Sequence, residues 1–468
     1  MGGKISNTYA YNKANLPVLQ TDGILGKTYS VSYNVDKNIS AINETGKGEK
    51  TFAYDGAGRL VSETSAGEYS ISYGFDNRQN RVEKVYSDLA DSTNSNTVSY
   101  TYNLKNQLVS ERKTAGSKLD ITDYEYDFNG NIYTKIHREY DDQSTGGEPE
   151  LELSQIPGGI ERYTFNALDM PVSANINGAE TAYTYDGNNL RTSKTVNGTT
   201  TEFLYDGTDI IGEKTGAELK TYVRGDKLLS DSDGKYYHYD THGSVSALTN
   251  AQNEVLAQNT YDAYGAGSVS PLSPFGYCGE YFDNETGFVY LRNRYYDTQT
   301  GRFISEDPIK SGTNWYVYCE NNPIRYTDSF GLDKNLDDYI NANYAGKMTV
   351  TVAISRPVPN SRAVATINSS GMLDNGHSFL RLDDGNGNVK YLGLAPTEKS
   401  LTKMLLAEDV GGKMVDDSLS PWNVARVFEL NSDQYNGLSA FLSSAESSTP
   451  NYNIRDYNCT TFAVEGLK

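Results

Sequence analysis

The strongest constraint on the fold is a phrase that recurs through the first 270 residues. In it, an aromatic residue, a spacer and a second aromatic residue are followed by Asp or Asn, at intervals of roughly 20 to 27 residues. Side chains alternate between the faces of a strand, so both rings lie on one face. The Asp or Asn, often with Gly, tolerates positive φ and closes a hairpin turn. Clear copies are Tyr9-Ala10-Tyr11-Asn12, Tyr73-Gly74-Phe75-Asp76, Tyr100-Thr101-Tyr102-Asn103, Tyr124-Glu125-Tyr126-Asp127, Tyr163-Thr164-Phe165-Asn166 and Tyr183-Thr184-Tyr185-Asp186.

A hairpin of this kind cannot bury its aromatic face alone, so neighbouring hairpins must stack. Tyr outnumbers Phe by 38 to 14, and 43 Gly residues supply turns, as repetitive β structure requires. The sequence therefore predicts one continuous antiparallel β structure from about residue 9 to residue 330, with Tyr and Phe stacked on its inner side.

The repeated phrase resembles the YD repeats of a family that includes bacterial Rhs proteins, Tc-toxin C subunits and teneurins. The resemblance implies a mainly β fold in which residues 1–270 form a hollow antiparallel shell, or part of one, around a C-terminal toxic segment. Family shells contain more repeats than these residues hold. The resemblance therefore implies either the end of a longer protein or a shortened cassette.

Residues 271–332 closely resemble the Rhs-associated core that ends such a shell. The resemblance rests on the segments Tyr281–Ile309 and Asn314–Leu332. In the family this core plugs the shell and cuts the chain after a closing Asp-Pro-x-Gly-Leu signature. The matching residues here are Asp328-Ser329-Phe330-Gly331-Leu332, where Ser329 replaces the Pro and frees φ at that position.

The resemblance implies scission between Leu332 and Asp333 by a pair of aspartates, Asp307 and Asp328. Two carboxyl groups held close together do not readily ionise at the same time. The ionised aspartate can activate water or another nucleophile, while the protonated one donates to the scissile carbonyl. We therefore expect aspartate-dependent autoproteolysis at the end of the core.

Beyond residue 332 the Tyr-Asp phrases stop, and residues 333–468 predict a separate small α+β domain. Apolar patterning predicts strands at residues 347–354, 378–382 and 388–394. A helix is expected from the cap at residues 431–433 through Leu442, and another from Asn458.

This domain contains one histidine, His377, and one cysteine, Cys459. A cysteine at a helix N-terminus is favoured as thiolate and, beside an imidazole, becomes a nucleophile. A Gly-His strand that precedes an Asn-Cys helix resembles circularly permuted papain-like proteins, including NlpC-like hydrolases, PPPDE peptidases and lecithin:retinol acyltransferase relatives. The resemblance implies a Cys459–His377 dyad acting on a peptide, amide or acyl ester. Candidates for the residue that orients the histidine are Asp383, Asp384 and Asn388.

Composition argues against several other classes of protein and of site. The net charge is -20 and no Lys/Arg run is present, so nucleic-acid binding by the whole chain is not expected. Three Cys and four His are scattered, which predicts neither a disulfide framework nor a metal site, and no cofactor is expected. The chain shows no classical signal peptide and no apolar run long enough for a membrane span.

These patterns favour the C-terminal part of an Rhs-type polymorphic toxin, with a carrier that releases a Cys-His hydrolase or acyltransferase. The expected partners are an immunity protein and either a secretion-system adaptor or the N-terminal remainder of the shell. The expected location is secreted or cell-surface by a specialised export route, with the effector acting in or on a target cell. Two alternatives stay open: a cell-surface carrier or adhesin with a non-catalytic tail, and a toxin tail of another class such as a nuclease.

Overall fold

The computed structural model describes residues 7–13, 16–140 and 159–332, except 188, 226 and 311. Beyond residue 332 it describes seven strands and the residues Asn436 and Ser439. The chain divides into two compact units. One comprises Met1–Leu204 and Ile211–Lys334, and the other Tyr205–Ile210 and Asn335–Lys468.

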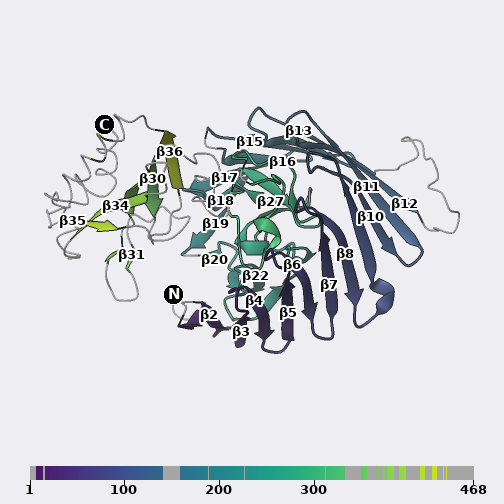
Figure 1. The fold of residues 1–468 in the computed structure, drawn as a ribbon, viewed down its shortest axis with the longest axis horizontal. Coiled ribbons are helices and arrows are strands. Elements are labelled where there is room, and N and C mark those ends of the chain that lie inside the picture. Colours follow the sequence, from purple (N-terminus) through teal and green to yellow (C-terminus); the bar gives the residue numbers. More distant parts are fainter. Residues whose placement is uncertain are drawn as a thin grey trace. The chain divides into compact units, whose positions relative to one another are not determined.

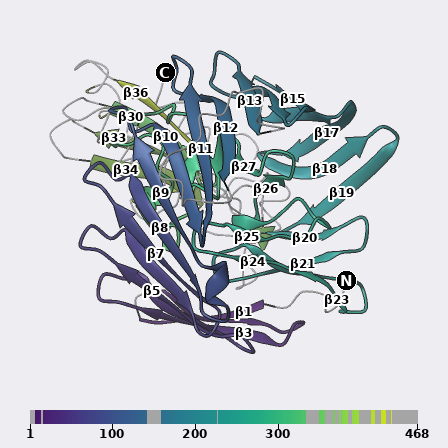
Figure 2. The ribbon, with the colours of Figure 1, turned by 90° about the vertical axis from the view of Figure 1, so that its right-hand side faces the viewer.

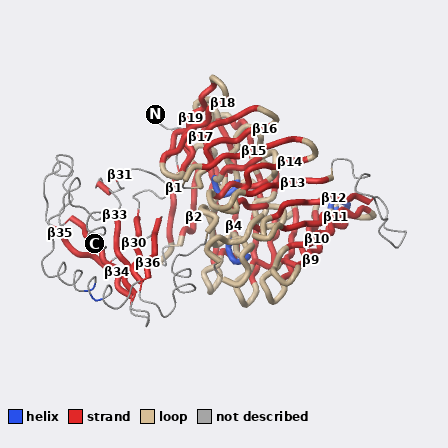
Figure 3. Tube along the Cα trace, turned by 90° about the horizontal axis from the view of Figure 1, so that it is seen from above, coloured by secondary structure: helices blue, strands red, loops and turns tan. Residues whose placement is uncertain are grey.

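The first unit is dominated by one 23-stranded sheet, β1 to β23, in which each strand runs antiparallel to the next in the chain (Figure 1). Figure 3 shows these strands joined by short turns. Up to residue 140 they are β1 (Asn7–Tyr11), β2 (Pro17–Asp22), β3 (Lys27–Tyr33), β4 (Ile39–Glu44), β5 (Gly48–Tyr54), β6 (Leu60–Ser65), β7 (Tyr69–Phe75), β8 (Arg81–Asp88), the 3-10 turn η1 (Ser92–Asn94), β9 (Asn96–Tyr102), β10 (Leu108–Ala115), β11 (Lys118–Tyr126) and β12 (Ile132–Tyr140). After residue 158 they are β13 (Ile160–Phe165), β14 (Pro171–Ile176), β15 (Ala179–Tyr185), β16 (Arg191–Val196), β17 (Thr199–Asp206), β18 (Asp209–Thr215), β19 (Glu218–Arg224), β20 (Leu228–Asp231), β21 (Tyr236–Tyr239), β22 (Val245–Thr249) and β23 (Val255–Gln258).

The Asp or Asn of each phrase is a hydrogen-bond acceptor in its turn. Oδ1 of Asp55 accepts the amides of Ala57 at 2.9 Å and Arg59 at 3.0 Å. The residue with positive φ is Gly58, at 80°. The expectation that the Asp itself takes positive φ was therefore wrong: that conformation falls three positions later. The same arrangement joins Asn34 with Lys37, Asp76 with Gln79, Asn103 with Asn106, Asp127 with Gly130, Asn166 with Asp169, Asp231 with Gly234, Asp240 with Gly243, Asn250 with Asn253 and Asp262 with Gly265.

The two aromatic residues of each phrase do different work on the inner face. In the phrases from Tyr73 to Tyr183 the first ring is buried, as at Tyr100, which is 6% exposed, whereas Tyr9 of the first phrase is 45% exposed. Where the second is a tyrosine, its hydroxyl can bond to an earlier hairpin: Tyr102 donates to the carbonyl of Arg81 at 2.7 Å. A phenylalanine cannot donate this bond, which explains the excess of Tyr. Equivalent bonds run from Tyr33 to Pro17, Tyr54 to Ile39, Tyr185 to Pro171 and Tyr239 to Leu228.

After Gln258 the chain leaves the sheet, so the expectation of one continuous β structure to residue 330 was wrong beyond that point. Residues 259–332, here called the junction segment, form small separate sheets, and the large sheet curves around this green segment (Figures 1 and 2). Two of its strands, β27 and β28, are buried on both faces and lack the alternation of the repeats. The elements are β24 (Thr260–Tyr261), β25 (Gly267–Ser268), η3 (Tyr277–Gly279), β26 (Tyr281–Asp283), β27 (Phe288–Leu291), β28 (Arg294–Asp297), β29 (Arg302–Phe303) and η4 (Cys319–Asn321).

Where the chain leaves the sheet, its first residues bind charged side chains on the inner face of that sheet. Lys84 forms an ion pair with Asp262 at 2.9 Å. The amide of Ala263 donates to Oε2 of Glu63 at 2.8 Å. Burial raises the pKa of Glu63 to about 7. These bonds attach the first residues of the junction segment to the inner face instead of to the edge strand.

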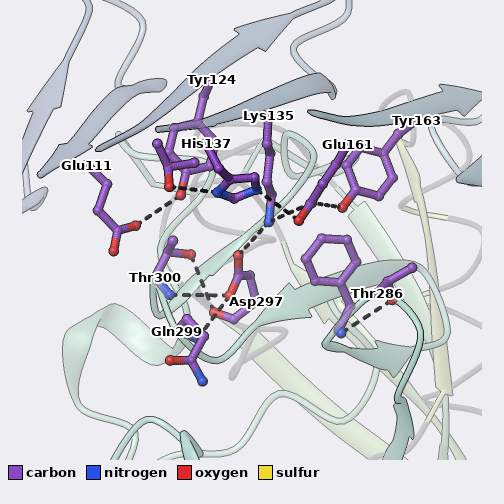
Figure 4. A network of polar contacts seen from close by, with 12 residues as sticks. Glu111, Tyr124, Lys135, His137, Glu161, Tyr163, Thr286, Asp297, Gln299 and Thr300 are labelled. Carbon is purple, nitrogen blue, oxygen red and sulfur yellow. Dashed lines mark hydrogen bonds and ion pairs between the residues drawn. The ribbon is translucent and has the colours of Figure 1, made fainter. Parts of the chain in front are cut away.

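Ion pairs join the junction segment to the sheet further along (Figure 4). Nζ of Lys135, on β12, lies 3.1 Å from Oδ2 of Asp297 on β28. His137 contacts Glu161 at 3.0 Å. Burial alone would raise the pKa of Glu161, but the hydrogen bond with His137 and the charge of Lys135 lower it to about 2. The large sheet and the junction segment therefore contact each other through ion pairs as well as through aromatic rings.

The second unit contains a five-stranded sheet in the order β35-β34-β33-β30-β36, with antiparallel pairing. The predicted strands at 347–354, 378–382 and 388–394 are confirmed as β30, β33 and β34. Asn436 and Ser439 are helical, within the first expected helix. The helix expected from Asn458 lies outside the described residues. The strands are β30 (Thr349–Ser355), β31 (Thr366–Ile367), β32 (Leu373–Asp374), β33 (His377–Asp383), β34 (Val389–Pro396), β35 (Gly412–Asp416) and β36 (Val424–Glu429).

Among the described residues, no helix is both long and apolar enough to cross a membrane. The same residues contain no cluster of three or more His, Cys, Asp or Glu side chains able to hold a metal ion. Cys278 and Cys319 carry free thiols, and burial raises the pKa of Cys278.

Candidate functional site

Arg294 is the centre of the candidate site. It opens β28 directly after the tight turn from β27, where Leu291 pairs with Arg294. Its side chain is 4% exposed and its guanidinium stacks on the ring of Phe303, 3.5 Å from the centroid. Nη1 donates to the carbonyl of Trp315 at 3.0 Å. Ring and carbonyl together fix the plane of the guanidinium.

The structure brings the two predicted aspartates to this guanidinium. Nη2 of Arg294 lies 3.4 Å from Oδ2 of Asp328 and 4.0 Å from Oδ1 of Asp307. Asp307 and Asp328 are both buried. A guanidinium between two carboxylates offsets their mutual repulsion.

Leu332, the residue before the predicted cut, is held by the same two side chains. Its amide donates to Oδ1 of Asp328 at 3.1 Å. Its carbonyl accepts a hydrogen bond from Nη2 of Arg294 at 3.2 Å. In the structure Arg294 donates to this carbonyl, and a protonated aspartate as a donor stays a prediction.

The residues before Leu332 are held by the β27–β28 turn. Arg292 donates to the carbonyl of Ser329 at 2.8 Å, and Asn293 donates to that of Phe330 at 3.0 Å. Ser329 gives the backbone a freedom that Pro would remove, and the bond from Arg292 restrains its carbonyl instead. These hydrogen bonds thus fix the path of the chain to the site.

Gly331 cannot be replaced without moving this path. Its φ is 64°, in the left-handed region. A Cβ there would lie 2.8 Å from the carbonyl oxygen of Leu291 and 2.9 Å from the amide nitrogen of Arg294. The glycine of the closing signature is therefore required by close approach to the turn that carries the arginine.

A cavity of about 100 Å³ lies at the site. Arg294, Asp307, Asp328 and Leu332 contribute to its lining, as does Asn314. A polar cavity of this size has room for water molecules. The arrangement can present water to the Leu332 carbonyl beside a carboxylate.

Sequence reasoning found the aspartates but missed Arg294. The available signal was the phrase Leu291-Arg292-Asn293-Arg294-Tyr295, in which two arginines interrupt an otherwise apolar and aromatic stretch. A charged side chain in such a stretch must find a buried partner. That partner could not be identified until the fold brought Asp307 and Asp328 alongside.

The predicted residues of the tail are only partly covered by the structure. His377 is the first residue of β33, and its backbone pairs with Ser355 of β30. Asp383 ends the same strand. The nucleophile predicted at Cys459 lies outside the described residues, as do Asp384 and Asn388. The dyad therefore stays a prediction.

No protein-family model matches the chain. It is 31% identical over 295 residues to the tRNA3(Ser)-specific nuclease WapA of Bacillus spizizenii, which covers 59% of this chain and 12% of that protein. It is 33% identical over 107 residues to the double-stranded DNA deaminase toxin A of Burkholderia cenocepacia, covering 21% and 7%. It is 32% identical over 111 residues to the toxin protein Tse5 of Pseudomonas aeruginosa, covering 22% and 8%. The chain thus spans a small part of the length of each relative. Over that part it is similar to proteins named as nucleases and toxins, which supports an Rhs-type toxin.

Proposed function

We propose that this chain is a toxin carrier that cuts itself between Leu332 and Asp333 and so frees a C-terminal effector. The observation that carries the proposal is the hydrogen bond from Arg294 to the Leu332 carbonyl, with Asp307 and Asp328 beside it. A fixed donor on a carbonyl, in a buried site next to carboxylates, is the arrangement that acyl transfer to water needs.

In the proposed reaction Asp307 takes a proton from a water molecule in the cavity. The water oxygen bonds to the carbonyl carbon of Leu332, and Arg294 stabilises the negative charge that develops on the carbonyl oxygen. The carbon–nitrogen bond then breaks, and Asp307 returns the proton to the departing amine of Asp333. Asp328 holds the Leu332 amide throughout. The products are a carboxylate at Leu332 and a free amine at Asp333.

Purified wild-type protein should therefore yield a fragment that begins at Asp333, detected by intact mass spectrometry. Asp307→Asn should keep the chain whole, since loss of a general base costs on the order of 10²- to 10⁴-fold. Asp328→Asn should also slow the cut. Glu306→Gln is the matched control, because this neighbouring carboxylate pairs with Lys310 instead of Arg294. Wild-type chain that stays whole on long incubation would refute the proposal.

For the effector we propose a cysteine hydrolase or acyltransferase in which Cys459 is the nucleophile and His377 its base. The support comes from the sequence motif and its order in the chain. The effector would act in or on a target cell reached by a specialised export route, and an immunity protein would protect the producer. A secretion-system adaptor or an N-terminal remainder of the shell would assist the carrier.

Cys459 should react with iodoacetamide at about pH 6.5 faster than Cys278 or Cys319, because an activated thiol has a pKa below the ~8.5 of a free one. His377→Ala should slow this labelling, measured by peptide mass spectrometry. Cys278 is a suitable reference, since burial raises its pKa. Equal labelling of Cys459 and Cys278, or indifference to His377, would remove the chemical basis of the cysteine-enzyme assignment.

A second candidate is an effector that acts on nucleic acid. The relatives include a protein named as a tRNA nuclease and another named as a double-stranded DNA deaminase. Toxicity that survives Cys459→Ala and is accompanied by tRNA cleavage or DNA deamination would favour this candidate over the cysteine enzyme.

A further inference from the structure

One stretch of the junction segment, residues 313–325, lies along the repeat turns of the large sheet. Its side chains donate to carbonyls and to an Asn side chain of the turns, and its Thr313 carbonyl accepts a bond from the turn residue Asn106. Among the contacts are Asn322 Nδ2 with Asn38 Oδ1 at 3.1 Å and with the Gly58 carbonyl at 2.8 Å, Asn321 Nδ2 with the Gln79 carbonyl at 2.9 Å, Asn106 Nδ2 with the Thr313 carbonyl at 3.2 Å, and the Tyr316 hydroxyl with the Gly130 carbonyl at 2.8 Å.

Asn314 makes the contact with the turn between β7 and β8. Its Nδ2 donates to the carbonyl of Arg78 at 2.9 Å and to Oδ1 of Asn80 at 2.7 Å. Asn314 is 7% exposed, so these bonds form away from bulk water. Nη1 of Arg302 also reaches Oδ1 of Asn80, at 3.3 Å. With Asn321, whose Nδ2 donates to the Gln79 carbonyl, the turn is thereby bonded to the junction segment from three positions.

The same residue borders the candidate site. Asn314 and Gln79, which belongs to the turn, both line the cavity that contains Asp307. Trp315, the next residue, presents its carbonyl to Nη1 of Arg294. A continuous set of contacts therefore runs from the β7–β8 turn through Asn314 and Trp315 to the guanidinium that binds the Leu332 carbonyl.

We infer that Asn314 is a positioning residue for the cut, and that the chain is cut only when the β7–β8 turn is folded against the junction segment. The inference rests on the proposed scission. Catalysis depends on placing donor and carbonyl within a fraction of an ångström, and a misplacement of about 1 Å costs on the order of 10²-fold. In this inference the large sheet both surrounds the scission site and helps to position its residues.

The test compares two asparagines of the junction segment in the full-length protein. Asn314→Ala should slow formation of the Asp333 fragment by roughly 10- to 100-fold. Asn322→Ala is the matched control, since it also gives up two hydrogen bonds to repeat turns but does not border the cavity. It should cut within about twofold of the wild-type rate, while the two variants lose similar thermal stability.

The same comparison can be made from the side of the sheet. Asn80→Ala removes the acceptor for Asn314 and should slow the cut, although Asn80 lies more than 200 residues away in sequence. Asn38→Ala, which removes the acceptor for Asn322, should not. Cutting at the wild-type rate by Asn314→Ala, or a slowing that tracks thermal stability in all four variants, overturns the inference and leaves the scission itself standing. A wild-type chain that stays whole overturns both.

Discussion

Arg294→Lys should slow scission by roughly 10²- to 10³-fold while leaving the fold intact. The planar guanidinium donates hydrogen bonds to the carbonyls of Gly331, Trp315 and Leu332. A lysine ammonium keeps the charge beside the two aspartates but has neither the planar fork nor the flat face that stacks on Phe303. The rate constant for appearance of the Asp333 fragment, followed by mass spectrometry, measures the loss.

Arg292→Lys is the control for this substitution. Arg292 comes from the same turn but donates to the carbonyl of Ser329, three residues before Leu332. Its replacement should alter the rate much less. If both lysine variants cut equally fast, the carbonyl contact of Arg294 has no catalytic role.

Asp283→Asn should lower the free energy of unfolding by about 3 to 5 kcal/mol. Asp283 pairs with Arg191, and neither side chain is exposed. It also binds Lys194 at 3.0 Å. The amide keeps the shape but leaves the charge of Arg191 buried without its carboxylate, among rings such as Tyr290, whose centroid lies 4.6 Å from its Cζ. A fall in the urea midpoint of unfolding measures this cost.

An exposed ion pair provides the comparison. Lys214 and Glu202 lie 3.4 Å apart on the sheet, with side chains 51% and 60% exposed. Solvent screens such a pair, so Glu202→Gln should change stability by less than about 1 kcal/mol. Equal effects of the two substitutions would mean that the Arg191–Asp283 contact does not anchor the junction segment.

The repeat sheet could be predicted because its signal is local. Tyr100 and Tyr102 share a face by alternation, and Asn103 ends the strand. The conformation of the turn could not be predicted as well, because the positive φ falls on residues as different as Lys37 and Gln79. The sequence shows the Asp or Asn that accepts hydrogen bonds at the start of each turn. It does not show that the residue three positions later takes the positive φ.

The end of the sheet could not be predicted from the phrase alone. Tyr261-Asp262 continues the pattern, and Asp262 even forms the usual turn to Ala266. The strands around it nevertheless form a separate pair, because Lys84 and Glu63 bind this segment on the inner face. Such a choice depends on partners distant in sequence.

In the candidate site, too, some residues could be predicted from the sequence and others only from the fold. The resemblance supplied Asp307 and Asp328, and the structure placed both beside one guanidinium. Arg294 was missed because its importance depends on three segments that meet only after folding. The role of Gly331 likewise follows from its approach to Leu291, which no spacing in the chain reveals.

The tyrosine hydroxyls give the large sheet a direction. Tyr33, Tyr54, Tyr102, Tyr185 and Tyr239 each donate to a carbonyl that precedes them in the chain. A chain that emerges from the ribosome N-terminus first can therefore close each of these bonds as soon as its tyrosine appears, without waiting for a later repeat. The junction segment, which needs the finished inner face, is synthesised after it. The order of synthesis thus matches the direction of these bonds, and the residues proposed to make the cut are synthesised only after the strands that surround them.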